Sequence, residues 1–234
     1  MRAVCKREFR AYFQSPLGYV FIAVLYFFTA YYFFTFNLYR NSTDMSSVFS
    51  ELFSVSLFLV PILTMRLMSE DKRSRTDQLL LTAPVSRIGI VLGKYVSALC
   101  VYLIGISATA LMTLVLCCFG QPDLPVISGN ILGLALLGVS LIAICMFLSS
   151  LTESQVIAAV CGFAASLFLI LLDALIYVVS NGFVKRMLTY MSFSNRYKGF
   201  TIGLIDASNV LFFISIAVLF ILLTSAVSEK RRWS

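Results

Sequence analysis

The chain has 234 residues, of which 60% are hydrophobic and 12% are charged, and its formal net charge is +7. With a mean hydropathy of +0.94, this composition excludes a water-soluble domain, which needs far more charged residues on its surface. Ordinary membrane topology accounts for the positive charge, so the charge does not indicate nucleic-acid binding.

Six apolar runs have about the 20 residues that a helix needs to cross about 30 Å of hydrocarbon. They lie near residues 17–36, 49–67, 92–119, 128–149, 156–180 and 208–227. No polar segment between them is long enough to bury a core of its own. The sequence therefore predicts an all-α membrane protein in which residues 1–234 form a single transmembrane domain of six helices.

Basic residues indicate the orientation of these spans. With six spans, the N-terminus, the segment between the second and third runs, and the C-terminus all lie on one side. Their basic residues are Arg2, Lys6, Arg7, Arg10, Arg66, Lys72, Arg73, Arg75, Arg87, Lys94, Lys230, Arg231 and Arg232. The positive-inside rule makes this side cytoplasmic, although a second basic group at residues 185–198 opposes the assignment.

Residues 2–14 can form a short amphipathic helix that lies in the membrane interface. Its apolar side would carry Cys5, Phe9, Tyr12 and Phe13. Ser15-Pro16 would end the helix and turn the chain into the membrane. The alternative is a disordered basic tail.

The first span is rich in aromatic residues, including Tyr26, Phe27 and Tyr31. Aromatic residues gather at membrane interfaces, but here they also fill the interior of the run. Two interpretations stay open: the rings line a path for a hydrophobic substrate, or they pack against other helices and lipid.

The densest charged interval is Met65 to Lys94, between the second and third spans. Its composition predicts a short cytoplasmic helix over residues 69–84, with Ser69 as N-cap and Glu70 and Asp71 in the first turn. Ala83-Pro84 would end it. The leucines at 79–81 would be exposed beside the membrane, where they require lipid or a protein partner.

The sequence GIVLGK at residues 89–94 superficially resembles a phosphate-binding loop. It has three residues between its glycines instead of four, and Tyr95 follows where the motif requires Ser or Thr. The chain also has no His, and its six Cys show no CxxC spacing. We therefore predict no enzyme activity, no bound cofactor and no metal in this chain.

Pairs of small residues four positions apart predict close helix contacts. They occur at Gly89 and Gly93, at Gly129 and Gly133, and at Ala158 and Gly162.

Asp173 is the only acidic residue well inside a span. Twenty residues after Glu153, it would lie roughly 30 Å along the helix, near the outer face. A carboxylate in hydrocarbon needs a partner or a cavity. We favour pairing with Lys185 or Arg186, and the alternative is a direct role in the substrate path.

Residues 181–206 are too polar to cross the membrane and too apolar for a free loop. They predict an external interfacial helix or a re-entrant hairpin, with Asn195 and Gly199 as breakers.

Four segments carry a resemblance to a known family. They are KREFRAYFQSPLGY at residues 6–19, MRLMSEDKRSRTDQLLLTAPVS with IVLGK at 65–94, GLID at 203–206, and EKRRW at 229–233. On these segments, essentially the whole chain resembles the membrane-spanning subunits of ABC-2 type transporters, in particular the small permeases of the gliding-motility type.

This resemblance implies a multi-pass permease in a bacterial plasma membrane, with both termini cytoplasmic and external helices before the sixth span. Two permeases, identical or related, would dimerise, and each would dock a separate ATPase subunit that binds ATP and Mg. Residues 69–84 would be the coupling helix, and the dimer would export its substrate. The residues expected to contact the ATPase are Glu70, Asp71, Lys72, Arg73, Arg75, Thr76, Leu79, Leu80 and Pro84.

A second hypothesis is a non-transporting membrane scaffold that recruits a cytoplasmic partner through residues 69–84. Both hypotheses need an exposed docking segment, so the sequence alone separates them poorly.

Overall fold

A computed structural model describes residues 2–73, 87–179 and 182–230. Six of its helices are long and apolar enough to cross a membrane. They are Pro16–Leu38, Ser46–Arg73, Ile88–Phe119, Leu124–Leu151, Gln155–Ile176 and Ala207–Ser228. Five of the predicted apolar runs lie within these helices, and the run at 156–180 overlaps Gln155–Ile176 but extends beyond its end. The prediction of an all-α fold with six spans is confirmed.

The described residues form helices and no strand. Their bounds are α1 (Arg2–Gln14), α2 (Pro16–Phe33), the π-helix η1 (Phe34–Leu38), α3 (Ser46–Thr64), α4 (Arg66–Arg73), α6 (Arg87–Phe119), α7 (Leu124–Leu151), α8 (Gln155–Val178), α9 (Gly182–Met191), α10 (Phe193–Thr201) and α11 (Ala207–Lys230).

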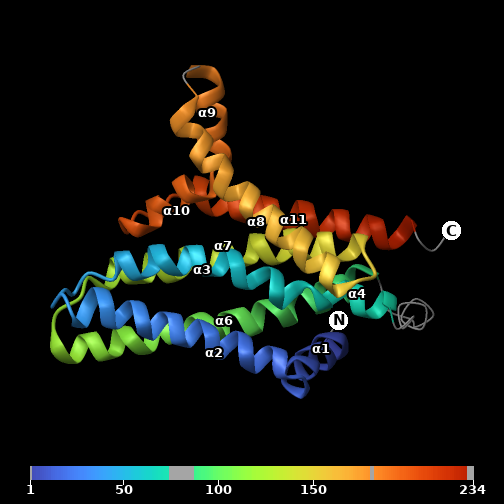
Figure 1. Ribbon diagram of the computed structural model, residues 1–234, viewed down its shortest axis with the longest axis horizontal. Coiled ribbons are helices and arrows are strands. Elements are labelled where there is room, and N and C mark those ends of the chain that lie inside the picture. The colour runs from blue at the N-terminus through green and yellow to red at the C-terminus, as the bar shows by residue number, and fades with distance from the viewer. Residues whose placement is uncertain (1, 74–86, 180–181, 231–234) are drawn as a thin grey trace.

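The bundle is organised around α7, which packs against α3, α4, α6, α8, α10 and α11. At one end lie α1, α4 and the C-terminal end of α11, and at the opposite end lie the α2–α3 and α6–α7 connections (Figure 1). We call these the α4 end and the turn end. Helix α9 projects away from the bundle (Figure 1) and has no buried residue.

The segment at residues 2–14 is helical, as expected, and forms α1. Val4 and Tyr12 are buried, whereas Lys6 and Arg10 are exposed. Ser15 is extended and Pro16 begins α2, because a proline at the first helical position lacks only a hydrogen bond that the helix could not make. The break between α1 and α2 therefore lies where the sequence predicted it.

Two glycines allow close helix approaches at the predicted small-residue pairs. A Cβ on Gly133 would lie 3.0 Å from atoms of Tyr197 and Phe200 in α10, and one on Gly162 would lie 2.9 Å from Pro61 in α3. The expected helix contacts are present at both positions.

The prediction for residues 181–206 was wrong about the breakers. Asn195 and Gly199 both lie inside α10, and the chain breaks at Ser192. The Ser192 side chain accepts a hydrogen bond from the Asn195 backbone N–H at 3.0 Å. This N-cap starts α10 and fixes the break.

Candidate functional site

The charged helix at the α4 end begins earlier than the sequence predicted. Helix α3 ends at Thr64 and α4 begins at Arg66, so Ser69 is a buried residue inside α4 and not its N-cap. Its hydroxyl donates to the Met65 carbonyl, one turn back. The chain continues almost directly from the membrane span into α4, which places Glu70 and Asp71 in the second turn.

The predicted coupling helix at residues 69–84 is described only as far as Arg73. The remainder, at residues 74–84, lies outside the described residues. It includes the expected ATPase contacts Arg75, Thr76, Leu79, Leu80 and Pro84.

Ser149 of α7 holds the junction between α3 and α4. Its hydroxyl donates to the Met65 carbonyl at 3.1 Å and accepts from the backbone N–H groups of Met68 at 3.3 Å and Ser69 at 3.2 Å. The first backbone N–H groups of a helix have no partner within that helix, and Ser149 accepts two of them here. Lys72 donates to the Ser150 carbonyl, so α4 is fixed to the end of α7.

A buried lysine joins three helices at the same end. The Lys94 side chain of α6 is only 2% exposed, and its Nζ lies 2.6 Å from Asp71 Oδ2 of α4 and 3.6 Å from Glu8 Oε1 of α1. Nζ also donates to the Leu67 carbonyl at 2.6 Å. We call Glu8, Asp71 and Lys94 the Lys94 cluster.

The charges of this cluster are balanced by a neighbouring arginine. Arg7 donates to Glu8 Oε1 from Nη2 at 2.5 Å and from Nε at 3.2 Å. This hydrogen bond raises the pKa of Arg7 above its ordinary value. Among the described residues, Arg7 and Lys94 thus face the carboxylates of Glu8 and Asp71, and buried charges are tolerated when they are paired in this way.

Tyr12 gives α1 a second attachment, to α3. Its hydroxyl donates to the Leu63 carbonyl at 2.9 Å. Burial raises the pKa of Tyr12 well above its ordinary value, so the side chain stays a neutral donor. Helix α1 is consequently bound to α3 through Tyr12 and to α6 through Glu8.

The Asp71–Lys94 ion pair joins α4 to α6. Asp71 lies two residues before α4 ends at Arg73, and Lys94 lies seven residues after α6 begins at Arg87. The ion pair therefore links α4 directly to α6, the two described helices on either side of residues 74–86 in the chain. This geometry suits the transmission of a movement between helices.

The candidate substrate-path residues do not come together within one chain. Tyr26 donates to or accepts from Ser107 Oγ at 3.0 Å and donates to the Ile104 carbonyl at 3.3 Å, which attaches α2 to α6. Phe27 and Tyr31 are 65% and 53% exposed on the outside of α2. Asp173 lies on α8, which is not among the helices that α2 packs against in the described chain.

Asp173 has a different partner from the one predicted. Its carboxylate accepts a hydrogen bond from Ser192, at the junction of α9 and α10. Among the described residues, no ion pair joins Asp173 to Lys185 or Arg186, and both are exposed on α9. The expected pairing was wrong because the chain turns at Ser192, which brings that serine and not the basic residues of α9 to Asp173.

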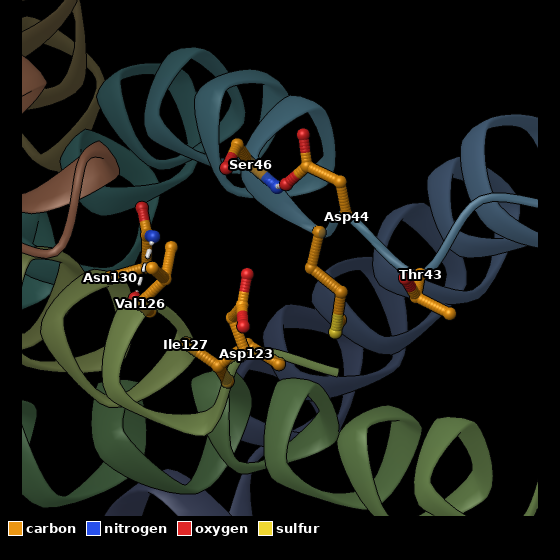
Figure 2. Close-up of a pocket in the computed structure, with 8 residues that line it drawn as sticks. Thr43, Asp44, Ser46, Asp123, Val126, Ile127 and Asn130 are labelled. Carbon is orange, nitrogen blue, oxygen red and sulfur yellow. Dashed lines mark hydrogen bonds between the residues drawn. The ribbon is translucent and has the colours of Figure 1, made fainter. Parts of the chain in front are cut away.

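A small pocket lies at the turn end. It has a volume of about 70 Å³, and Asp44, Asp123 and Asn130 are among the residues around it (Figure 2). Asn130 donates from Nδ2 to the Val126 carbonyl at 2.8 Å. Pockets for drug-sized molecules measure about 300–1,000 Å³, so this one is too small to hold a large substrate.

Sequence reasoning missed Lys94, Glu8 and Ser149. Lys94 was counted with the basic residues of a cytoplasmic segment, but it lies within the apolar sequence IGIVLGKYVSAL. A charged residue in an apolar sequence indicates a buried partner. This pattern could have identified Lys94 from the sequence. Nothing in the sequence distinguished Glu8 or Ser149 from surface residues.

Six apolar helices, each long enough to cross a membrane, define the chain as a multi-pass helical membrane protein. The family model for ABC-2 family transporter proteins matches residues 11–228, and the chain belongs to this family. It is therefore a permease of an ABC transporter, the membrane component and not itself the ATPase. A comparison with curated proteins gave no match.

Proposed function

We propose that this permease couples ATP hydrolysis by a separate ATPase subunit, which binds ATP and Mg, to export of a substrate. The observation that carries the proposal is the Asp71–Lys94 ion pair, which joins the helices before and after residues 74–86 in the chain. A force applied to that segment would act on α4 and α6 together. Glu8 and Tyr12 would pass it to α1 and α3.

The Lys94 cluster changes the role that we propose for Asp71. Its side chain is only 17% exposed and pairs with Lys94, so we propose that Asp71 joins α4 to α6 instead of contacting the ATPase directly. Glu70, whose side chain is 41% exposed and pairs with Arg66 one turn earlier, is the better candidate for contact with the ATPase. The other contacts proposed are Lys72, Arg73, Arg75, Thr76, Leu79, Leu80 and Pro84.

We further propose that the α4 end faces the cytoplasm of a bacterium, with both termini on that side of the plasma membrane. The basic residues of α1 and α4 support this orientation. Two permeases, identical or related, would form the working dimer. Exposed apolar side chains on α2, α8 and α11 are available both to lipid and to a second permease.

The test is stimulation of the ATPase by the permease in proteoliposomes, with the ATPase co-purified from native membranes. We expect Glu70→Lys to abolish most of the stimulation while the permease stays folded. Asp123→Lys is the matched control, because it reverses an exposed acidic charge at the turn end and should leave stimulation unchanged.

Equal stimulation by Glu70→Lys and the native chain would overturn the proposed contact. Substrate movement decides between the transporter and the scaffold. A complex that binds the ATPase, yet moves no substrate in an ATP-dependent assay on native membranes, would favour a non-transporting scaffold that recruits a cytoplasmic partner.

A further inference from the structure

An apolar groove lies between α1 and α6 on the outside of the bundle. Its volume is about 730 Å³. The apolar residues that line it are Cys5, Phe9, Val96, Cys100, Leu103 and Ile104. It is separate from the Lys94 cluster and plays no part in the proposed coupling to an ATPase.

The groove begins where α1 crosses α6 at Gly93. A Cβ on Gly93 would lie 3.1 Å from the Val4 side chain and 3.3 Å from the Cys5 backbone nitrogen, so the two helices are in close contact there. From Val96 to Ile104 the groove follows α6 for about 12 Å, at 1.5 Å per residue. This part of α6 belongs to a membrane span, so the groove opens toward hydrocarbon.

Two basic side chains of α1 complete the lining. Arg2 and Lys6 are four residues apart, and both are exposed. The ion pairs of the described residues join Arg7, Arg66 and Lys94 to carboxylates, and none of them includes Arg2 or Lys6. The groove thus combines an apolar channel along a membrane helix with two cations on the interfacial helix beside it.

We propose that this groove is a binding site for an anionic phospholipid. The acyl chain would lie along α6 against Val96, Cys100 and Leu103, and the phosphate would contact Arg2 and Lys6. Cationic side chains attract anionic headgroups at the membrane surface, and their stems pack on apolar surface. The bound lipid would fill the space between α1 and α6 and hold α1 in place.

The proposal can be tested with a tryptophan placed in the groove and brominated lipids as quenchers. The chain has one Trp, so the reporter is Phe9→Trp combined with Trp233→Phe, in vesicles of phosphatidylcholine and phosphatidylglycerol. Val160→Trp in the same background is the matched control, because Val160 is 60% exposed on α8 outside the groove. We expect quenching of the Phe9→Trp fluorescence to show that brominated phosphatidylglycerol binds roughly tenfold more tightly than brominated phosphatidylcholine. The Val160→Trp control should show no preference between the two lipids.

A second pair of variants tests the cations. Arg2→Gln with Lys6→Gln should abolish the preference, whereas Arg10→Gln, an exposed basic residue of α1 outside the lining, should preserve it. If Phe9→Trp does not fold, Leu103→Trp reports from the opposite wall and should show the same preference.

Three outcomes would overturn the proposal. The first is an equal preference at Phe9→Trp and Val160→Trp, which would mean that the groove holds only ordinary surrounding lipid. The second is a preference that survives the loss of both cations. The third is the absence of quenching by either lipid, which would mean that a second permease or another protein covers the groove.

Discussion

The two ends of α3 are held in the same way, but their surroundings differ in charge. At the α4 end Tyr12 donates to the Leu63 carbonyl at 2.9 Å, and at the turn end Tyr197 donates to the Phe49 carbonyl at 3.3 Å. Both tyrosines are buried and belong to short helices outside the spans, α1 and α10. Two short helices therefore attach to one membrane helix through matching hydrogen bonds.

The two ends differ in the partners of their charged side chains. Lys94 is paired with carboxylates of two other helices, from positions 8 and 71 of the chain. At the other end, Arg196 donates to Ser208 Oγ and Asn209 Oδ1, both at 3.0 Å, and lies over the rings of Tyr190 and Phe212.

The α4 end is thus held by ion pairs between segments far apart in the sequence, whereas Arg196 is held by neutral groups close to it in the chain. Ion pairs across three helices oblige those helices to move together. The neutral contacts of Arg196 link α10 only to nearby parts of the chain, and α9, which has no buried residue, lies outside the bundle. This contrast leads us to expect transmission at the α4 end and local adaptation at the turn end.

The largest expected effect is that of Lys94→Met. It leaves the Asp71 and Glu8 carboxylates without their buried cation, and loss of one partner from a buried ion pair costs about 3–5 kcal/mol. We expect a lower free energy of unfolding by that amount, measured by denaturant titration in detergent micelles.

The double variant Lys94→Met with Asp71→Asn is the control for this prediction. It also removes the carboxylate that Lys94 balances, so it should be less destabilised than the sum of its single changes. Additive effects would show that Asp71 and Lys94 do not interact, and the contrast between the ends would lose its main support.

A smaller effect is expected for Ser192→Ala at the other end. The change removes an N-cap, worth about 1 kcal/mol, and the hydrogen bond to Asp173. We expect increased hydrogen exchange in α10 and near Asp173 of α8, because the Ser192 side chain hydrogen-bonds to these two helices, and no change in α1 or α4. Faster exchange in α1 or α4 as well would contradict the independence of the two ends.

The smallest effects are expected for the two tyrosines. Tyr12→Phe and Tyr197→Phe each remove one hydrogen bond, worth about 1 kcal/mol. The change at Tyr12 should cost more, because its bond is shorter and its helix also carries Glu8. A comparison of the two thermal unfolding curves measures the difference, and a larger loss at Tyr197 would reverse our ranking of the ends.

Most of the fold could be predicted because hydropathy is a local property. Each apolar run has the length of a membrane span, and Ser15-Pro16 breaks the chain where its residue types require a break. The predictions were wrong where a residue's role depends on contacts with distant helices. Ser69 has the residue type of an N-cap, but Ser149 of α7 accepts the backbone N–H groups at that junction.

The candidate site was predicted in part. Met65 to Lys94 was identified as the densest charged interval, and Asp71 and Lys94 within it form an ion pair. The sequence assigned Asp71 to the surface because an isolated helix next to charged residues has no reason to turn a carboxylate inward. Lys94 supplies that reason, and it lies on another helix.

The sequence by itself determined six spans, a basic α4 end and the break at Ser15-Pro16 before the first span, because length, hydropathy and charge can be read from neighbouring residues. The tertiary structure alone decided that Lys94 is buried between Asp71 and Glu8, and that Ser192 meets Asp173. Such pairs depend on which faces of distant helices meet, and the free energy of burying a charge makes that choice decisive.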